Sequence, residues 1–162
     1  MHLIGICLGF IRERLGEEAL QDLWRKDFDD LGLASGVFKK MTPEELATAV
    51  VTACRFVSSP LPALEGSVPF DVEEDDEKYV ISYRHCGSGG LFRREPNSES
   101  GQPWPVLEGT HDWAYGEHVN LYCPHCKVLT DMAREQSVGY EVEFGANPPS
   151  EPCRYIVRKR PG

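Results

Sequence analysis

Long hydrophobic runs, excess positive charge and internal repeats are all missing from this sequence of 162 residues. No apolar stretch approaches the roughly 20 residues of a membrane-spanning helix, so we expect no membrane partner. The first residues carry neither a basic leader nor a small-residue cleavage site, which predicts no secretory signal and a cytoplasmic location. The formal net charge of -9 argues against binding to the phosphates of a nucleic acid.

Several motifs of large enzyme classes are missing as well. The sequence has no nucleophile elbow, phosphate-binding loop, dinucleotide fingerprint or His-Glu-x-x-His helix. What remains is an ordinary globular composition, with 41% hydrophobic and 27% charged residues. The length suits a single domain over residues 1–162, with a helical half at 1–62 and a sheet half at 63–162.

The helical half shows apolar residues at helical spacing. The clearest helix is predicted from Pro43 to Ser58, because Thr42, Pro43 and Glu45 form a capping box with proline at the first helical position. Two earlier helices are predicted from apolar positions that recur every three to four residues. These positions are Ile4, Leu8, Ile11 and Leu15, and then Leu20, Leu23, Trp24, Phe28 and Leu31.

The sheet half alternates in the manner of strands. The acidic run 73–77 separates two expected strands and indicates a solvated hairpin turn. A later helix is expected over 127–136, and the proline-rich stretch 95–110 indicates a long surface loop. The order of elements predicts an α+β fold, with N-terminal helices packed on a small antiparallel sheet. The expected strands are 67–72, 78–84, 91–94, 139–144 and 154–159, and 118–122 is expected to be a short strand or an extended entry segment.

The cysteines carry the strongest chemical signal. Cys123 and Cys126 flank Pro124-His125, and two cysteines at this spacing can bind one metal ion. Cys86 precedes Gly87-Ser88-Gly89-Gly90, a turn whose backbone N–H groups can stabilise a thiolate. We therefore predict a Zn²⁺ site of Cys86, Cys123, Cys126 and a fourth ligand. His85 is preferred for that place, with His111, His118 and Cys153 as alternatives, and iron remains an alternative metal.

Other interpretations of the cysteines stay open. Cys7 and Cys54 lie in apolar helical stretches without nearby partners, so we expect them to be small buried hydrophobic residues. Cys-Pro-His-Cys also has the form of a thiol–disulfide oxidoreductase site, in which a helix N-terminus lowers the pKa of the first thiol. The short chain after Cys126 offers too few elements for that fold, so redox catalysis is the weaker alternative.

Aromatic and histidine residues gather between Trp104 and Tyr122. This segment either lines a pocket for a small organic ligand or packs as a long loop onto the sheet. If the protein is an enzyme, His111 or His118 is the candidate catalytic group that moves a proton.

The second half also resembles a known pattern. A hairpin, a cysteine, a long loop, a helix ending near Glu135, Gly139, a strand and then Cys153-Arg154-Tyr155-Ile156-Val157 follow one another between about Ser67 and Lys159. This succession is similar to the 4-vinyl reductase-like and L-2-amino-thiazoline-4-carboxylic acid hydrolase-like small-molecule domains. The resemblance implies helices on an antiparallel sheet, a pocket for aromatic or heterocyclic molecules, and a homodimer as one candidate assembly. It also implies Cys153 and Glu135 as candidate zinc ligands.

The sequence therefore predicts a zinc protein that binds or transforms a small aromatic or heterocyclic molecule, with specialised metabolism as one candidate setting. As an enzyme it would perform hydrolase-type or lyase-type chemistry, in which zinc polarises a carbonyl group or activates water. The alternatives are a non-catalytic ligand-sensing or adaptor module with structural zinc, and the thiol–disulfide oxidoreductase.

Overall fold

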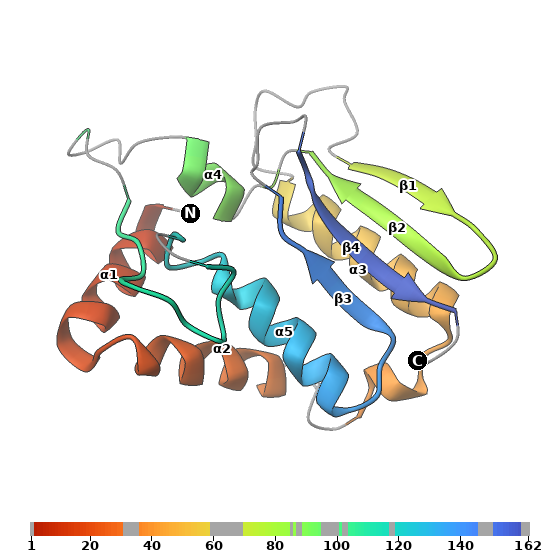
Figure 1. The fold of residues 1–162 in the computed structure, drawn as a ribbon, viewed down its shortest axis with the longest axis horizontal. Coiled ribbons are helices and arrows are strands. Elements are labelled where there is room, and N and C mark those ends of the chain that lie inside the picture. The colour runs from red at the N-terminus through yellow and green to blue at the C-terminus, as the bar shows by residue number, and fades with distance from the viewer. Residues whose placement is uncertain are drawn as a thin grey trace.

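A computed structural model describes residues 2–30, 36–58, 70–84, 86, 89–94, 101, 104–116, 119–145 and 151–159 (Figure 1). The described part of the chain is α+β, as the sequence predicted. Its elements are the helices α1 (His2–Leu15), α2 (Glu18–Asp30), α3 (Pro43–Ser58), α4 (Gly89–Arg94) and α5 (Pro124–Glu135), the 3₁₀ turn Phe38–Lys40, and the strands β1 (Phe70–Glu74), β2 (Lys78–Tyr83), β3 (Tyr140–Glu143) and β4 (Cys153–Arg158).

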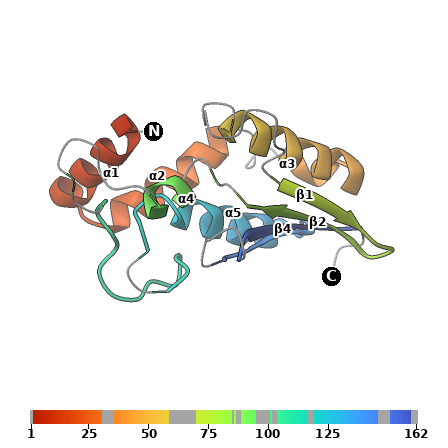
Figure 2. The same cartoon turned by 90° about the horizontal axis from the view of Figure 1, so that it is seen from above.

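The strands form one sheet of order β1-β2-β4-β3, with every neighbouring pair antiparallel. Helices α3 and α5 cover one face of this sheet, and α1 and α2 lie beyond α5 on the side away from the strands (Figures 1 and 2). Side chains of successive residues alternate between the two faces of a strand. Tyr83, Tyr140 and Tyr155 consequently point toward the helices.

The beginning of α3 forms as the capping box predicted. The backbone N–H of Thr42 donates to Glu45 Oε2 at 2.8 Å, and the N–H of Glu45 donates to Thr42 Oγ1 at 3.2 Å. The acidic run is confirmed as a hairpin turn, because Asp75 Oδ1 accepts hydrogen bonds from the N–H groups of Glu77 and Lys78. Side-chain oxygens that accept from nearby backbone N–H groups thus stabilise both the start of α3 and the hairpin turn.

Helix α5 begins earlier than the expected residue 127. Pro124 occupies its first turn, where a missing N–H costs nothing, and the buried Asn120 supplies the acceptor. Asn120 Oδ1 accepts from the N–H groups of Tyr122 and Cys123, both at 3.0 Å. The first turn of α5 therefore contains Cys126, and Cys123 stands at its N-cap.

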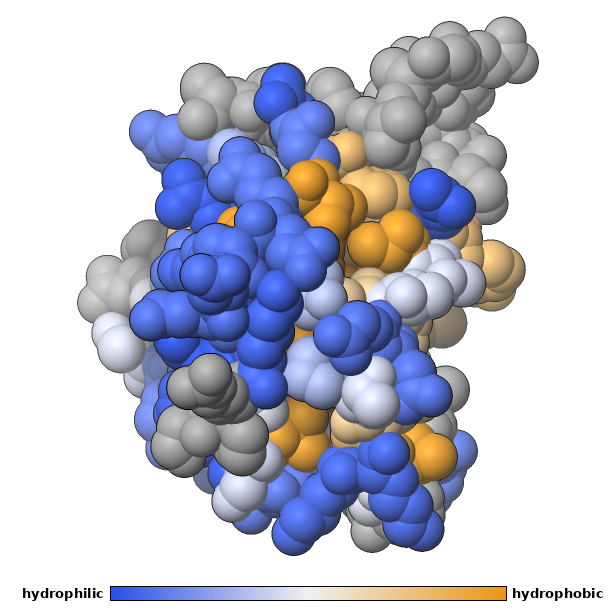
Figure 3. Space-filling model, turned by 90° about the vertical axis from the view of Figure 1, so that its right-hand side faces the viewer, coloured by the Kyte–Doolittle hydropathy of each residue, from blue (hydrophilic) through white to orange (hydrophobic). Residues whose placement is uncertain are grey.

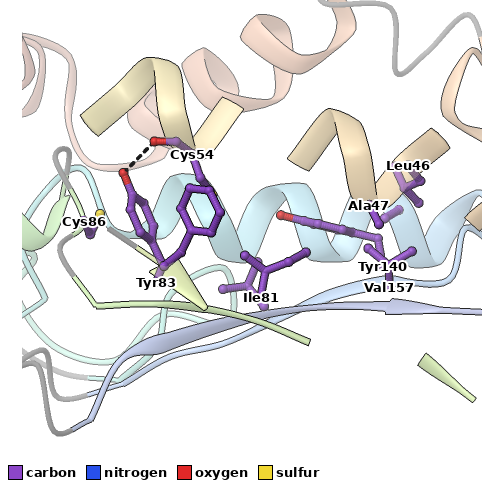
Figure 4. Packing of buried hydrophobic residues seen from close by; sticks show 11 residues of the cluster. Leu46, Ala47, Cys54, Ile81, Tyr83, Cys86, Tyr140 and Val157 are labelled. Atoms are coloured by element: carbon purple, nitrogen blue, oxygen red, sulfur yellow. Dashed lines mark hydrogen bonds between the residues drawn. The ribbon is translucent and has the colours of Figure 1, made fainter. Parts of the chain in front are cut away.

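Two hydrophobic cores lie on opposite sides of α5. The first joins α1, α2 and the segment 104–121, and α5 contributes Val128 and Met132 to it. The second joins α3 and the sheet, and α5 contributes Ala133, with Leu129 packed against both cores. Figure 4 shows the second core between α3, α5 and the strands.

Three sequence expectations need correction. The expected strand 91–94 is part of helix α4, because Gly89 packs without a Cβ beside Cys123 and the N–H of Gly90 donates to Cys86 Sγ at 3.4 Å. The expected strand 118–122 is reduced, among its described residues, to an isolated bridge from Asn120 to Val106. Cys7 is exposed rather than buried, because α1 packs through Leu8 and two glycines on another face.

The outer face of the sheet is charged. Ion pairs cross it from Arg154 to Glu143, from Arg158 to Glu141 and from Arg84 to Asp71. In Figure 3 hydrophilic side chains gather on the sheet side and apolar ones on the side of α3. Among the described helices, none is long and apolar enough to cross a membrane.

Candidate functional site

A cavity of about 410 Å³ lies inside the second core, between α3, α5 and the sheet. Small-molecule sites usually fall in the range of about 300–1,000 Å³. Its walls are mostly apolar, with Leu46 and Val50 from α3, Leu129 and Ala133 from α5, and Phe28 and Phe38 at the end near α2. Ala53 of α3 also lines it and is exposed, which places that residue at the mouth.

A small set of polar atoms faces this cavity. Tyr83 donates from its hydroxyl to the backbone oxygen of Cys54 at 3.2 Å, as Figure 4 shows. Cys126 Sγ lies 3.7 Å from the Tyr155 hydroxyl. The polar lining residues are Tyr83, Tyr122, Tyr140, Tyr155, His125, Cys54 and Cys126.

Burial raises the pKa of several of these phenols and thiols. It is the largest cause that raises the pKa of the Tyr140 and Tyr155 phenols and of the Cys126 thiol. The neighbouring Cys86 and Cys123 raise the pKa of Cys126 further, whereas the hydrogen bond from Tyr155 lowers it. Burial likewise raises the pKa of Cys54 to about 12.

The predicted metal cysteines meet where α4 and α5 begin. A Cβ built on Gly89 would lie 2.5 Å from Cys123 Sγ, so the two helix starts are in direct contact and only glycine fits at position 89. Asn120 joins them, because its Nδ2 donates to Gly89 O and to Cys123 Sγ, each at 3.0 Å. Cys86 is buried and receives the N–H of Gly90. The structure thus brings Cys86 and Cys123 into one neighbourhood with Cys126.

These cysteines do not make a finished metal centre by themselves. In the described ranges, no group of three His, Cys, Asp or Glu side chains is arranged to hold a metal ion. His85, the preferred fourth ligand, lies outside the described residues. Of the ligands implied by the family resemblance, Glu135 is exposed and pairs with Arg25 at 2.6 Å, and Cys153 Sγ accepts the N–H of Gly145 at 3.4 Å.

The predicted catalytic histidines are not part of the cavity lining that the structure describes. His111 Nε2 lies 2.8 Å from Glu17 Oε2 and 2.9 Å from the backbone oxygen of Glu108. It therefore ties the segment 104–116 to the start of α2. His118 lies outside the described residues. Within the aromatic segment, Trp113 packs in the first core and Tyr122 lines the cavity.

His125 is the histidine that sequence reasoning missed. It lines the cavity, packs against the Phe28 ring at 4.4 Å and approaches Asp27 Oδ2 with Nε2 at 3.8 Å. The nearby His125 ring lowers the pKa of the Asp27 carboxyl. Because His125 lies between two cysteines, the sequence suggested a metal site there rather than a cavity wall. The apolar residues of α2, spaced one helical turn apart, were the only indication that a helix would pack against it.

Comparisons of the chain with protein-family models, with curated proteins and with solved structures find no match.

Proposed function

We propose that the protein binds a small, largely apolar organic molecule in the cavity between α3, α5 and the sheet. One observation carries this proposal, namely a cavity of about 410 Å³ with aromatic walls and a few inward polar groups. An apolar ligand would replace water there and bury apolar surface that the fold leaves uncovered.

A neutral naphthyl ketone dye, Prodan, tests this proposal, because its emission shifts to the blue in apolar surroundings. Saturable binding to the wild-type protein at micromolar dye is the expected result. Ala53→Trp should abolish it by filling the mouth. Thr52→Trp places the same bulk on the preceding residue of α3, which is also exposed, and should leave dye binding unchanged. Equal binding by both variants, or none by the wild type, contradicts the proposal.

Zinc is the second part of the proposal, with Cys86, Cys123, Cys126 and His85 as the residues that would hold it. Hydrogen bonds from Gly90 N–H to Cys86 and from Asn120 Nδ2 to Cys123 support it, because such donors stabilise metal-bound thiolates. The described residues alone form no ligand group, so the site depends on His85 and on thiol side chains that turn toward one ion. With these four side chains as ligands, zinc would have no open coordination position and would hold the starts of α4 and α5 together.

Elemental analysis with a count of reactive thiols tests the metal. About one zinc per chain in the wild type, lost in Cys123→Ser and retained in Cys7→Ser, is the expected result, because Cys7 is exposed on α1 and remote from the group. Absence of zinc together with a reducible Cys123–Cys126 disulfide would instead favour the oxidoreductase alternative.

A further inference from the structure

The cavity has no charged wall. Among its described lining residues there is no Lys, Arg, Asp or Glu. Burial raises the pKa of the Tyr140 phenol above its usual range, so this hydroxyl keeps its proton. An anionic ligand would lose its hydration without meeting a cation, in a protein whose net charge is already -9.

The Tyr140 hydroxyl in the cavity is available to a ligand. Tyr140 is 7% exposed, and its hydroxyl has no hydrogen bond to any described residue. Two other phenols of this region are hydrogen-bonded within the protein, since Tyr83 donates to Cys54 O and Tyr115 donates to Val142 O at 3.0 Å. Figure 4 shows the Tyr140 ring lying along the sheet with its oxygen toward the side of Tyr83 and Cys54. Among the described residues, Trp24 Nε1 is the only fully buried side-chain N or O atom without a partner. The Tyr140 hydroxyl is instead open to the cavity, where it can donate to a ligand atom.

We propose that the ligand is a neutral aromatic molecule with a carbonyl or ether oxygen, and that this oxygen accepts a hydrogen bond from the Tyr140 hydroxyl. The inference rests on the proposed function and narrows it to a ligand class. Aromatic rings suit the walls, because the rings of Phe28, Tyr83 and Tyr122 offer edges and faces for ring packing. Carboxylates and phosphates of the same size are excluded by the missing cation.

Three naphthalenes of nearly equal shape test the inference, measured by displacement of Prodan at pH 7. 2-Acetonaphthone carries the acceptor oxygen, 2-ethylnaphthalene lacks it, and 2-naphthoate carries a negative charge. We expect the ketone to bind about tenfold more tightly than the hydrocarbon, as one hydrogen bond to a buried donor allows. The carboxylate should bind at least about a hundredfold more weakly than the ketone, because its charge stays unpaired.

Tyr140→Phe removes only the hydroxyl and should equalise the two neutral compounds. Tyr115→Phe removes a phenol hydroxyl that is bonded to Val142 and should preserve the tenfold preference. A carboxylate that binds as well as the ketone, or a preference that survives Tyr140→Phe, overturns the inference while the cavity remains a binding site. If Prodan itself does not bind the wild-type protein, the proposed function fails and the inference fails with it.

Discussion

The two cores on either side of α5 differ in how they are filled. The first contains Trp24 and Trp113 and packs Leu20 and Leu107 to zero exposure. The second places Tyr83, Tyr140 and Tyr155 around a cavity of about 410 Å³. Protein interiors are normally packed as densely as organic crystals, so a hollow of this size is unusual. Helix α5 therefore separates the first core, which is filled by side chains, from the second core, which leaves space for a ligand.

Matched leucine truncations give the largest expected difference between the cores. Leu20→Ala in the first core should cost about 4 kcal/mol of unfolding free energy, because its fully buried side chain leaves a new void. Leu46→Ala should cost about 2 kcal/mol, because Leu46 already borders the cavity and loses fewer contacts. Urea denaturation monitored by circular dichroism measures both. Equal losses would mean that the second core is as tightly filled as the first.

The junction where α4 meets α5 should be the next most sensitive place. Asn120→Ala removes the acceptor for Tyr122 and Cys123 N–H and the donor to Gly89 O, and should cost about 2–3 kcal/mol. Thr42→Ala removes the exposed cap of α3 and should cost only about 1 kcal/mol. The same urea experiment measures both variants. A smaller loss for Asn120→Ala than for Thr42→Ala would show that this junction is not held by the asparagine.

Removing single hydroxyls compares a bonded phenol beside the sheet, Tyr115, with an unbonded one on β3, Tyr140. Tyr115→Phe should cost about 1 kcal/mol, because it deletes the hydrogen bond to Val142 O. Tyr140→Phe should change the stability by less than about 0.5 kcal/mol, because its hydroxyl is open to the cavity and has no hydrogen-bond partner among the described residues. Thermal melts without ligand separate the two cases. A clear loss for Tyr140→Phe would mean that the fold itself uses this hydroxyl.

The smallest effect on stability is expected for the ion pair of Asp27 and His125 at the edge of the cavity. The lowered pKa of Asp27 means that its contribution to stability is present above its unfolded pKa of about 3.9, and is lost as the pH falls through the lowered value. The pair is half-exposed, so the contribution should stay below about 1 kcal/mol. Asp27→Asn should therefore lower the urea midpoint slightly at pH 6 and leave it equal to the wild type near pH 2. A difference that persists at the lower pH would have another cause.

The sequence predicted those parts of the fold that depend on hydrogen bonds between residues close together in the chain. The Thr42–Glu45 capping box and the Asp75 turn act within four residues of the chain, so their elements are confirmed. Segment 91–94 was wrongly expected to be a strand, because its helix depends on Gly89 packing against Cys123, more than thirty residues away in sequence. The start of α5 was missed because Asn120 supplies its acceptor from outside the helix.

The site was harder to predict. Cys86, Cys123 and Cys126 were expected to lie together and do, whereas zinc binding by these residues is a proposal. The cavity could not be predicted because its walls come from α2, α3, α5 and three strands, and each residue alone is typical of an ordinary core. Tyr140 shows this best, because alternation predicts that it faces inward, whereas only the packing around it leaves its hydroxyl without a partner.

The most direct test of the hollow core is nuclear magnetic resonance on protein with ¹³C-labelled tyrosine rings, titrated with 2-acetonaphthone. We predict saturable shifts of Tyr83, Tyr140 and Tyr155, which line the cavity, and little change at Tyr79, which does not. Shifts that spare Tyr140 while Tyr79 moves would place the ligand elsewhere and contradict the account.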